Sequence, residues 1–380
     1  MIAKRSSIYR LARHLGSSAY EVFRKEILVR RLANRHVFST QKKFVGPELK
    51  LDCSYIVSTD RGLFHVRSNE VRCLFPYYTF GVAATGSSLF ASVSIGVDSY
   101  VIAMEISKDK KGQPILQARR ILYQIETKYH NERIHQLHVD GCRLAIANTR
   151  KNSITIIDAK TGELLTDLYP FADFTGFPIH TDHNHINSVY IGKDCIIFTA
   201  HNGGEIGSII GVIHGSQVYS YQFKNRGVHD IIPTHNGIIF SDTFGSSMSD
   251  FKGGGDLYNA GEWLIQKTEE RGYMVRGVAG SADELLVGHS FMGKREDRFK
   301  GRGGILLFRK GKFQSDYQLP SAQINDIIRS DGSKHAHEWN DITGGEAKRL
   351  CEAALGEPCH VGQLSVQLPN VKEFTTGEWY

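Results

Sequence analysis

The sequence predicts an all-β protein, a six-bladed β-propeller with a basic helical arm at its N-terminus. Two observations lead to this fold class. Pairs of short apolar runs separated by turn residues recur every 42 to 55 residues along the 380-residue chain. In addition, an unmatched first strand near the C-terminus fits an unmatched second and third strand near the N-terminus, so that the two ends of the chain complete one blade.

The repeat is clearest in two segments, IHQLHVDGCRLAIANT (Ile134–Thr149) and VHDIIPTHNGIIFSDT (Val228–Thr243). Each contains a short strand, a turn with Gly or Asn-Gly, and a second apolar strand. In both, a histidine is followed 14 residues later by a threonine. Aligning the other apolar pairs on this histidine gives one equivalent residue in each blade: Phe80, His135, Asn187, His229, Arg276 and Asn325.

The two ends of the repeat are expected to close the ring. QINDIIRSDG, which contains Asn325, has no second strand after it, whereas SYIVSTDRGLFHVRSNEVRCLF (Ser54–Phe75) lacks a first strand. A propeller that pairs these segments leaves no open sheet edge between its first and last blades. We therefore expect the propeller to span residues 46–330, and residues 331–380 to form an extension outside the ring.

The first 45 residues form a separate, basic segment. Residues 1–43 contain eleven lysines and arginines but only two acidic residues, Glu21 and Glu26, so the rest of the chain is weakly acidic. Apolar residues recur there at three- and four-residue steps, which predicts amphipathic helices. Such an arm can dock on an anionic membrane surface. An organelle transit peptide, or a helical arm packed on the body, are alternatives.

Polar residues are predicted to gather on the propeller axis, because the first strand of each blade lines the central channel. Five of the six equivalent first-strand residues are polar, and they include His135, His229 and Arg276. His185 precedes Asn187 by two residues and joins them. The ends of the second strands are expected to bring further groups to the same mouth, namely Asn148, His201, Asp242 and His289.

Two kinds of chemistry fit such a cluster. In the first, His135, His185, His229 and Arg276 are catalytic: a histidine acts as nucleophile or general acid/base, and Arg276 binds an anionic group. Substrate-binding roles then fall to Asn187, Asn325, Asn148, His201, Asp242 and His289. In the second, His135, His185 and His229 hold one divalent metal ion.

The segment TDHNHINSV (Thr181–Val189) resembles the His-Asp-Trp-x-His-x-Asn-Ser run of bacterial arylsulfotransferases. That family also forms six-bladed propellers with His, Asn and Arg around the axis. The resemblance implies that His185 and Asn187 bind a sulfuryl group. It also implies that His229 or His135 is the transient sulfo-acceptor.

These patterns favour an enzyme that acts on a small anionic or glycan substrate by group transfer or lyase chemistry. A metal-centred propeller enzyme and a non-catalytic propeller that binds a protein or glycan partner are the alternatives. Nothing in the body predicts a nucleic-acid partner. The six cysteines form no CxxC pair, which favours a reducing compartment. We expect a cytoplasmic protein, with peripheral membrane contact or organelle targeting through the arm.

Overall fold

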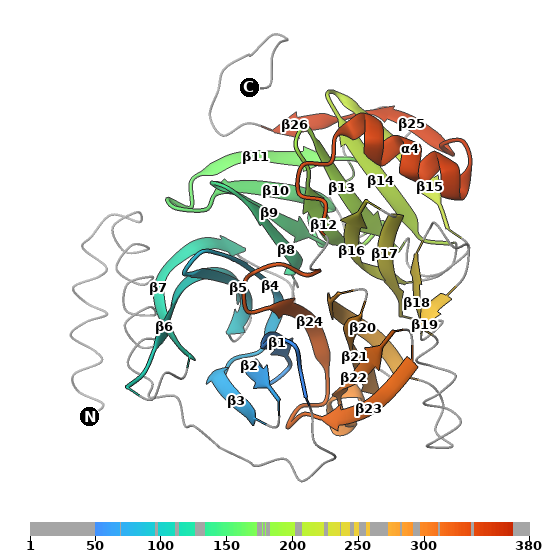
Figure 1. The fold of residues 1–380 in the computed structure, drawn as a ribbon. Coiled ribbons are helices and arrows are strands. Elements are labelled where there is room, and N and C mark those ends of the chain that lie inside the picture. The colour runs from blue at the N-terminus through green and yellow to red at the C-terminus, as the bar shows by residue number, and fades with distance from the viewer. Residues whose placement is uncertain are drawn as a thin grey trace, which may run out of the picture.

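The chain folds as a β-propeller, as the computed structural model shows (Figure 1). The structure describes residues 50–68, 70–95, 98–110, 114–125, 134–172, 177, 179, 183–201, 207–223, 227–235, 237–243, 247–250, 256–258, 273–281, 283–291, 297–310, 312–335 and 338–367. The predicted helical arm lies outside these residues, so it and the membrane contact assigned to it stay predictions. No helix in the described ranges is long and apolar enough to cross a membrane.

The described strands form six sheets of four or five strands, arranged around one axis. Their innermost strands are β4 (Thr79–Thr85), β8 (Ile134–Asp140), β12 (Ile186–Ile191), β16 (Val228–Thr234), β20 (Tyr273–Gly280) and β24 (Ile324–Arg329). The second strands are β5 (Ser88–Ile95), β9 (Arg143–Asn148), β13 (Cys195–Ala200), β17 (Gly237–Asp242), β21 (Glu284–Phe291) and β1 (Tyr55–Thr59).

Two further strands continue each sheet outwards. The third strands are β6 (Asp98–Lys108), β10 (Ser153–Asp158), β14 (Ile209–His214), β18 (Ser247–Asp250), β22 (Gly304–Arg309) and β2 (Gly62–Arg67). The fourth strands are β7 (Pro114–Ile125), β11 (Leu164–Tyr169), β15 (Gln217–Gln222), β19 (Asp256–Tyr258), β23 (Lys312–Gln318) and β3 (Glu70–Phe75). A short 3₁₀ helix, η2 (Arg298–Lys300), precedes β22.

The apolar runs become strands that are buried on both faces, because neighbouring sheets pack against each other around the ring. All six residues of β12 and all six of β17 are buried. Each core cluster lies between two adjacent sheets; one, for example, joins Val57 and Ile327 to Leu286 and Ile305 of the next sheet. The repeated alternation of core and sheet is what the period in the sequence encodes.

The predicted circular closure is confirmed. β24 from the C-terminal part of the chain pairs antiparallel with β1, with Tyr55 opposite Arg329 and Val57 opposite Ile327. The N-terminal strands β1, β2 and β3 thus receive their innermost strand from more than 240 residues later in the chain. This pairing leaves no gap between the first and last blades.

The described part of the C-terminal extension packs on the propeller. β25 (His360–Gln363) pairs with β15 and β26 (Ser365–Gln367) pairs with β11, so two sheets gain a fifth strand. Helix α4 (Gly344–Leu355) begins with a capping box between Thr343 and Glu346, and Cys351 on it joins the core formed by β13, β14 and β15. Residues 331–340 return to the centre of the ring (Figure 1). Residues 331–367 are therefore continuous with the ring, whereas the sequence led us to expect an extension outside it.

Candidate functional site

The six equivalent first-strand residues meet at the axis. Each innermost strand has a register shift against its neighbour at or directly after this residue. Such β-bulges bend a strand and re-aim its side chains, and they are frequent beside functional sites. One axial cavity of about 10 Å³ is lined by all six residues and by the polar residues that follow four of them. The lining residues are Phe80, His135, Gln136, Asn187, Ser188, His229, Asp230, Arg276, Asn325 and Asp326.

A ring of hydrogen bonds joins every blade to the next one. In each blade one polar side chain donates to the backbone carbonyl of the residue that precedes the axial residue of the following blade. The pairs are Ser92 to Ile134 (3.1 Å), Thr149 to Ile186 (2.6 Å), Asn187 to Val228 (2.8 Å), Thr243 to Val275 (2.9 Å), Ser290 to Ile324 (3.4 Å) and Asn325 to Thr79 (2.8 Å). The ring ties the blades together around the axis.

This ring explains the two axial asparagines. The Asn187 amide nitrogen donates to the Val228 carbonyl, and its Oδ1 accepts from the Thr199 hydroxyl at 2.6 Å. Both ends of the Asn187 amide are therefore occupied by the fold. Asn325 likewise uses its amide nitrogen for the ring, while its Oδ1 is buried and has no hydrogen-bond partner within the described residues. We predicted substrate-binding roles for both, and the geometry gives each a structural one.

The two histidines that precede a threonine by 14 residues are held in one tautomer. His135 Nδ1 lies 2.7 Å from the Thr149 hydroxyl, which already donates to the Ile186 carbonyl, so Nδ1 supplies the proton. His229 Nδ1 lies 2.7 Å from the Gly227 carbonyl oxygen, which can only accept. In the neutral state Nε2 of each ring therefore carries a lone pair. His229 Nε2 is buried and has no hydrogen-bond partner in the described part of the chain.

Four imidazoles form one cluster. The ring centroids of His135 and His185 are 5.0 Å apart, those of His185 and His201 3.9 Å, and those of His201 and His229 5.9 Å. His185 reaches this cluster with a left-handed backbone (φ +58°) just before β12, which is an uncommon conformation for a residue other than glycine. The structure thus brings together His135, His185, His201 and His229 as predicted.

The cluster is kept uncharged. Burial, His185 and the Arg276 guanidinium together lower the pKa of His201 to about 3. Burial and the Arg276 charge, with smaller effects of His201 and His135, hold the pKa of His229 well below its usual value. Both rings are therefore neutral near pH 7 and serve as hydrogen-bond acceptors or bases rather than as cations.

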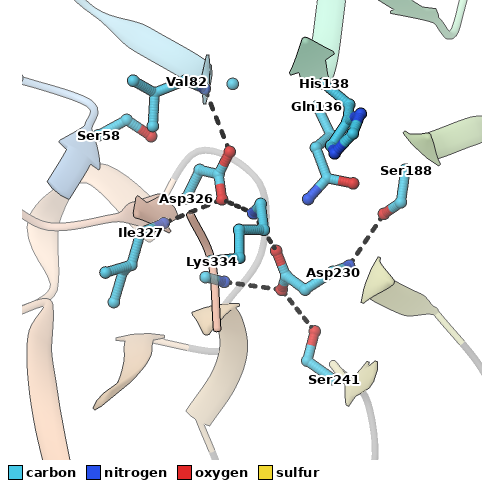
Figure 2. A network of polar contacts seen from close by, with 12 residues as sticks. Ser58, Val82, Gln136, His138, Ser188, Asp230, Ser241, Asp326, Ile327 and Lys334 are labelled. Atoms are coloured by element: carbon cyan, nitrogen blue, oxygen red, sulfur yellow. Dashed lines mark hydrogen bonds and ion pairs between the residues drawn. The ribbon is translucent and has the colours of Figure 1, made fainter. Parts of the chain in front are cut away.

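A buried ion triad lies directly beneath the histidines (Figure 2). Lys334, from the segment that returns to the axis, contacts Asp326 Oδ1 and lies 3.8 Å from Asp230 Oδ1. Asp230 also accepts hydrogen bonds from Ser241 Oγ and from the Gly277 backbone, both at 2.7 Å. All three charged side chains are at most 5% exposed, so Lys334 closes this side of the axis.

Three predicted second-strand residues point away from the axis. Asn148 donates to Thr155 of its own blade at 3.3 Å, and His289 Nε2 lies 2.9 Å from Asp316 on β23. The residue after each of Asn148, Asp242 and His289 is the one that bonds the neighbouring blade. Because successive strand residues face opposite sides, an error of one position reverses the side chain. His201 alone was aligned correctly, since it occupies the same position as Thr149.

Several functional positions were missed in the sequence. Gln136 and Ser188 directly follow axial residues, and the bulges turn both toward the cavity. The repeated spacing from histidine to threonine could have identified Thr149 and Thr243, but we used it only for alignment. Lys334 lies after the last repeat, so the periodicity contains no signal for it. His183 is exposed, and His180 lies outside the described residues.

The metal alternative finds no preformed site. Among the described residues, no group of three His, Cys, Asp or Glu side chains is arranged to hold a metal ion. The positions predicted for it, His135, His185 and His229, do share one cluster, but Arg276 lies close enough to lower the pKa of His229, and such a charge repels a cation.

Comparisons with known proteins add the fold alone. No family model and no curated protein matches the chain. Among solved structures, a chain of the nidogen/laminin complex is 8% identical with a TM-score of 0.46, over 74% of this chain and 99% of that one. A provisionally named 6-phosphogluconolactonase of Bacteroides fragilis is 14% identical (TM-score 0.40; 74% and 97% covered). The dihydro-heme d1 dehydrogenase NirN is 10% identical (TM-score 0.33; 73% and 58% covered).

Proposed function

We propose that the axial cluster is the catalytic centre of an enzyme that acts on a small anionic substrate, with His229 Nε2 as the basic nitrogen and Arg276 as the anion-binding group. The observation that carries this proposal is the His229 imidazole itself. It is 5% exposed, its Nδ1 proton is held by a backbone carbonyl, and its Nε2 lone pair has no partner within the described residues.

A fixed imidazole of this kind has the properties of a catalytic base. Its tautomer and orientation are set by the groups on Nδ1, as a general base requires. Its neighbours keep it neutral, so the lone pair is available to take a proton from a substrate or to form a bond to a transferable group. The first event leads to lyase chemistry and the second to group transfer.

Arg276 supports an anionic substrate. It lies on β20, one blade from His229, and its positive charge lowers the pKa of both His229 and His201. A guanidinium binds carboxylate, phosphate or sulfate through two parallel hydrogen bonds. Because Asn187 is occupied by the fold, Arg276 replaces it as the expected partner of an anionic group, including the sulfuryl group implied by the sequence resemblance.

The test starts with ligand binding, followed by turnover. Full-length protein would be screened by calorimetry and mass spectrometry against sulfate esters, phosphate esters and uronate sugars. Turnover should then fall by about a hundredfold or more in the His229→Gln variant, because the basic nitrogen is lost. The Arg276→Met variant should lose affinity for the anion and raise the pKa of His229, measured by NMR titration.

His65→Gln is the matched control. His65 on β2 is also buried, and burial with the charges of Arg67 and Arg72 lowers its pKa to about 4, yet it does not line the axial cavity. It should leave turnover unchanged. Full turnover in His229→Gln, or an equal loss in His65→Gln, would contradict the proposal. An equivalent of a transition metal that His229→Gln releases would favour the metal-centred alternative instead.

A further inference from the structure

The axial cavity contains a second feature that the proposed chemistry has not used: three buried polar atoms that border one small space. His229 Nε2, Gln136 Nε2 and Asn325 Oδ1 are each buried without a hydrogen-bond partner in the described ranges. All three residues line the cavity of about 10 Å³ at the axis. Gln136 and His229 are each 5% exposed, so leaving these atoms unpaired is costly.

Chemistry fixes which atom each residue presents. Gln136 Oε1 accepts from the Val189 backbone at 3.1 Å, so the amide nitrogen is the end left over (Figure 2). Asn325 donates from Nδ2 to the Thr79 carbonyl at 2.8 Å, which leaves Oδ1. His229 donates from Nδ1 to a carbonyl, which leaves the Nε2 lone pair. The cavity is therefore bordered by two acceptors and one donor.

Only a neutral molecule that both donates and accepts matches this set. A metal ion would face the Gln136 N–H donor and lie among Arg276, Lys334 and other positive charge. An anion would face two lone pairs. A water molecule can donate to His229 Nε2 and Asn325 Oδ1 while accepting from Gln136 Nε2, and a buried water makes about three such bonds in a space of about 10 to 15 Å³.

We propose that this cavity is a binding site for a single water molecule, and that this water is a co-substrate of the reaction at His229. The second part rests on the proposed function and narrows it to hydrolysis. The imidazole Nε2 takes one proton from the water as the water oxygen bonds to the electrophilic atom of the substrate. The bond to the leaving group breaks, its electron pair stays with that group, and the imidazolium returns the proton to it.

A crystal structure of the full chain tests the site without any substrate. The expected result is density for one molecule at about 2.7 to 3.2 Å from the three atoms. The Gln136→Glu variant keeps the acceptor for Val189 but turns the donor into a third acceptor, so the water should be lost. Ser290→Ala removes an interblade hydrogen bond outside the cavity and should keep it. An empty cavity, or an ion at about 2.0 to 2.2 Å, would overturn the site.

Turnover in H₂¹⁸O tests the role of the water. For a substrate found in the ligand screen, one ¹⁸O atom should appear in the product, and Gln136→Glu should turn over about a hundredfold more slowly. Product without label would refute hydrolysis while leaving the binding site intact. A screen with no turnover at all would refute the proposed function, and the crystal structure would still decide the water site.

Discussion

Replacing Lys334 by methionine tests the structural part of the axial assembly, independently of any activity. The methionine keeps an unbranched apolar stem in the same space but removes the ammonium group. In the native structure that group is the positive charge between Asp326 and Asp230, whose side chains are 2% and 4% exposed. The Lys334→Met variant therefore leaves two buried carboxyl groups facing each other without a cation.

The expected loss follows from the burial of these groups. Removing one partner of a buried ion pair costs about 3 to 5 kcal/mol, because the remaining charge has neither water nor a counter-ion. Whole domains are stable by only about 5 to 15 kcal/mol, so the effect is large. The aspartates also accept hydrogen bonds from Val82, Ile327, Ser241 and Gly277, which limit the loss but do not neutralise the charge.

The penalty should depend on pH. Burial, together with Asp230, raises the pKa of Asp326 to about 6 even though Lys334 lowers it. A carboxyl whose pKa is higher in the folded than in the unfolded chain stabilises the fold when protonated, so this contribution grows as pH falls through about 6 toward 3.8. Without Lys334 the pKa rises further. Lys334→Met should therefore cost less at pH 5 than at pH 8.

Urea unfolding monitored by circular dichroism at both pH values measures these differences. The matched control is Lys334→Met combined with Asp326→Asn and Asp230→Asn, which removes the whole triad and should regain most of the lost stability. A loss below about 1 kcal/mol in the single variant, or a penalty that does not shrink at pH 5, would refute the assigned burial of the triad.

Three further predictions concern the same axis. Burial depresses the pKa of His65, His201 and His229, so the stability that these neutral rings contribute is complete above about pH 6.5 and is lost as pH falls toward their folded values, by about 1.4 kcal/mol per ring and pH unit; His201→Gln should make the urea midpoint fall less steeply between pH 6.5 and 5, and an unchanged slope would contradict this. Thr243→Val deprives the Val275 carbonyl of its donor and should cost about 1 to 3 kcal/mol in thermal unfolding, similar to Asn187→Leu in the adjacent blade, while a neutral result in both would remove the ring from the account of stability. Gly81→Ala places a Cβ atom 2.1 Å from the His135 carbonyl oxygen and should cost at least about 1 to 3 kcal/mol, whereas Gly345→Ala on helix α4 meets open space and should stabilise by about 0.5 to 1 kcal/mol; equal effects of the two would show that the axis is less tightly packed than described.

The fold was predictable because its information is repeated. Each blade encodes the same two features, a strand-turn-strand pattern and one equivalent first-strand residue, so errors in one blade are corrected by the others. The closure of β24 on β1 followed from the same count. The position of residues 331–367 was not predictable in this way, since it depends on contacts that occur once, such as the pairing of β26 with β11.

The site was predictable only to the precision of strand register. The first-strand residues were aligned on His135 and His229, and all six line the cavity. The second-strand residues were aligned by eye at the strand ends, and three of four were displaced by one position. In a strand that small displacement exchanges the axis for the interior of the blade. Lys334 and the donor role of Gln136 require the three-dimensional structure, because they depend on bulges and on a segment outside the repeat.

The interblade ring also separates the axial residues that build the fold from those that the fold does not require. In the blades of Asn187 and Asn325, the axial residue itself donates the bond that closes the ring. In the blades of His135, His229 and Arg276, a separate hydroxyl does so, from Thr149, Thr243 and Ser290 respectively.

An imidazole or a guanidinium at those three positions is therefore not needed to join the blades, and a hydroxyl in each blade already satisfies the carbonyl that would need a partner. Burying a neutral His229 nevertheless costs stability as the pH falls, because its pKa is held far below the usual value. A residue that lowers stability and is not needed for closure is best explained by chemistry at its own ring nitrogen, and this reasoning singles out His229 and Arg276 over the asparagines beside them.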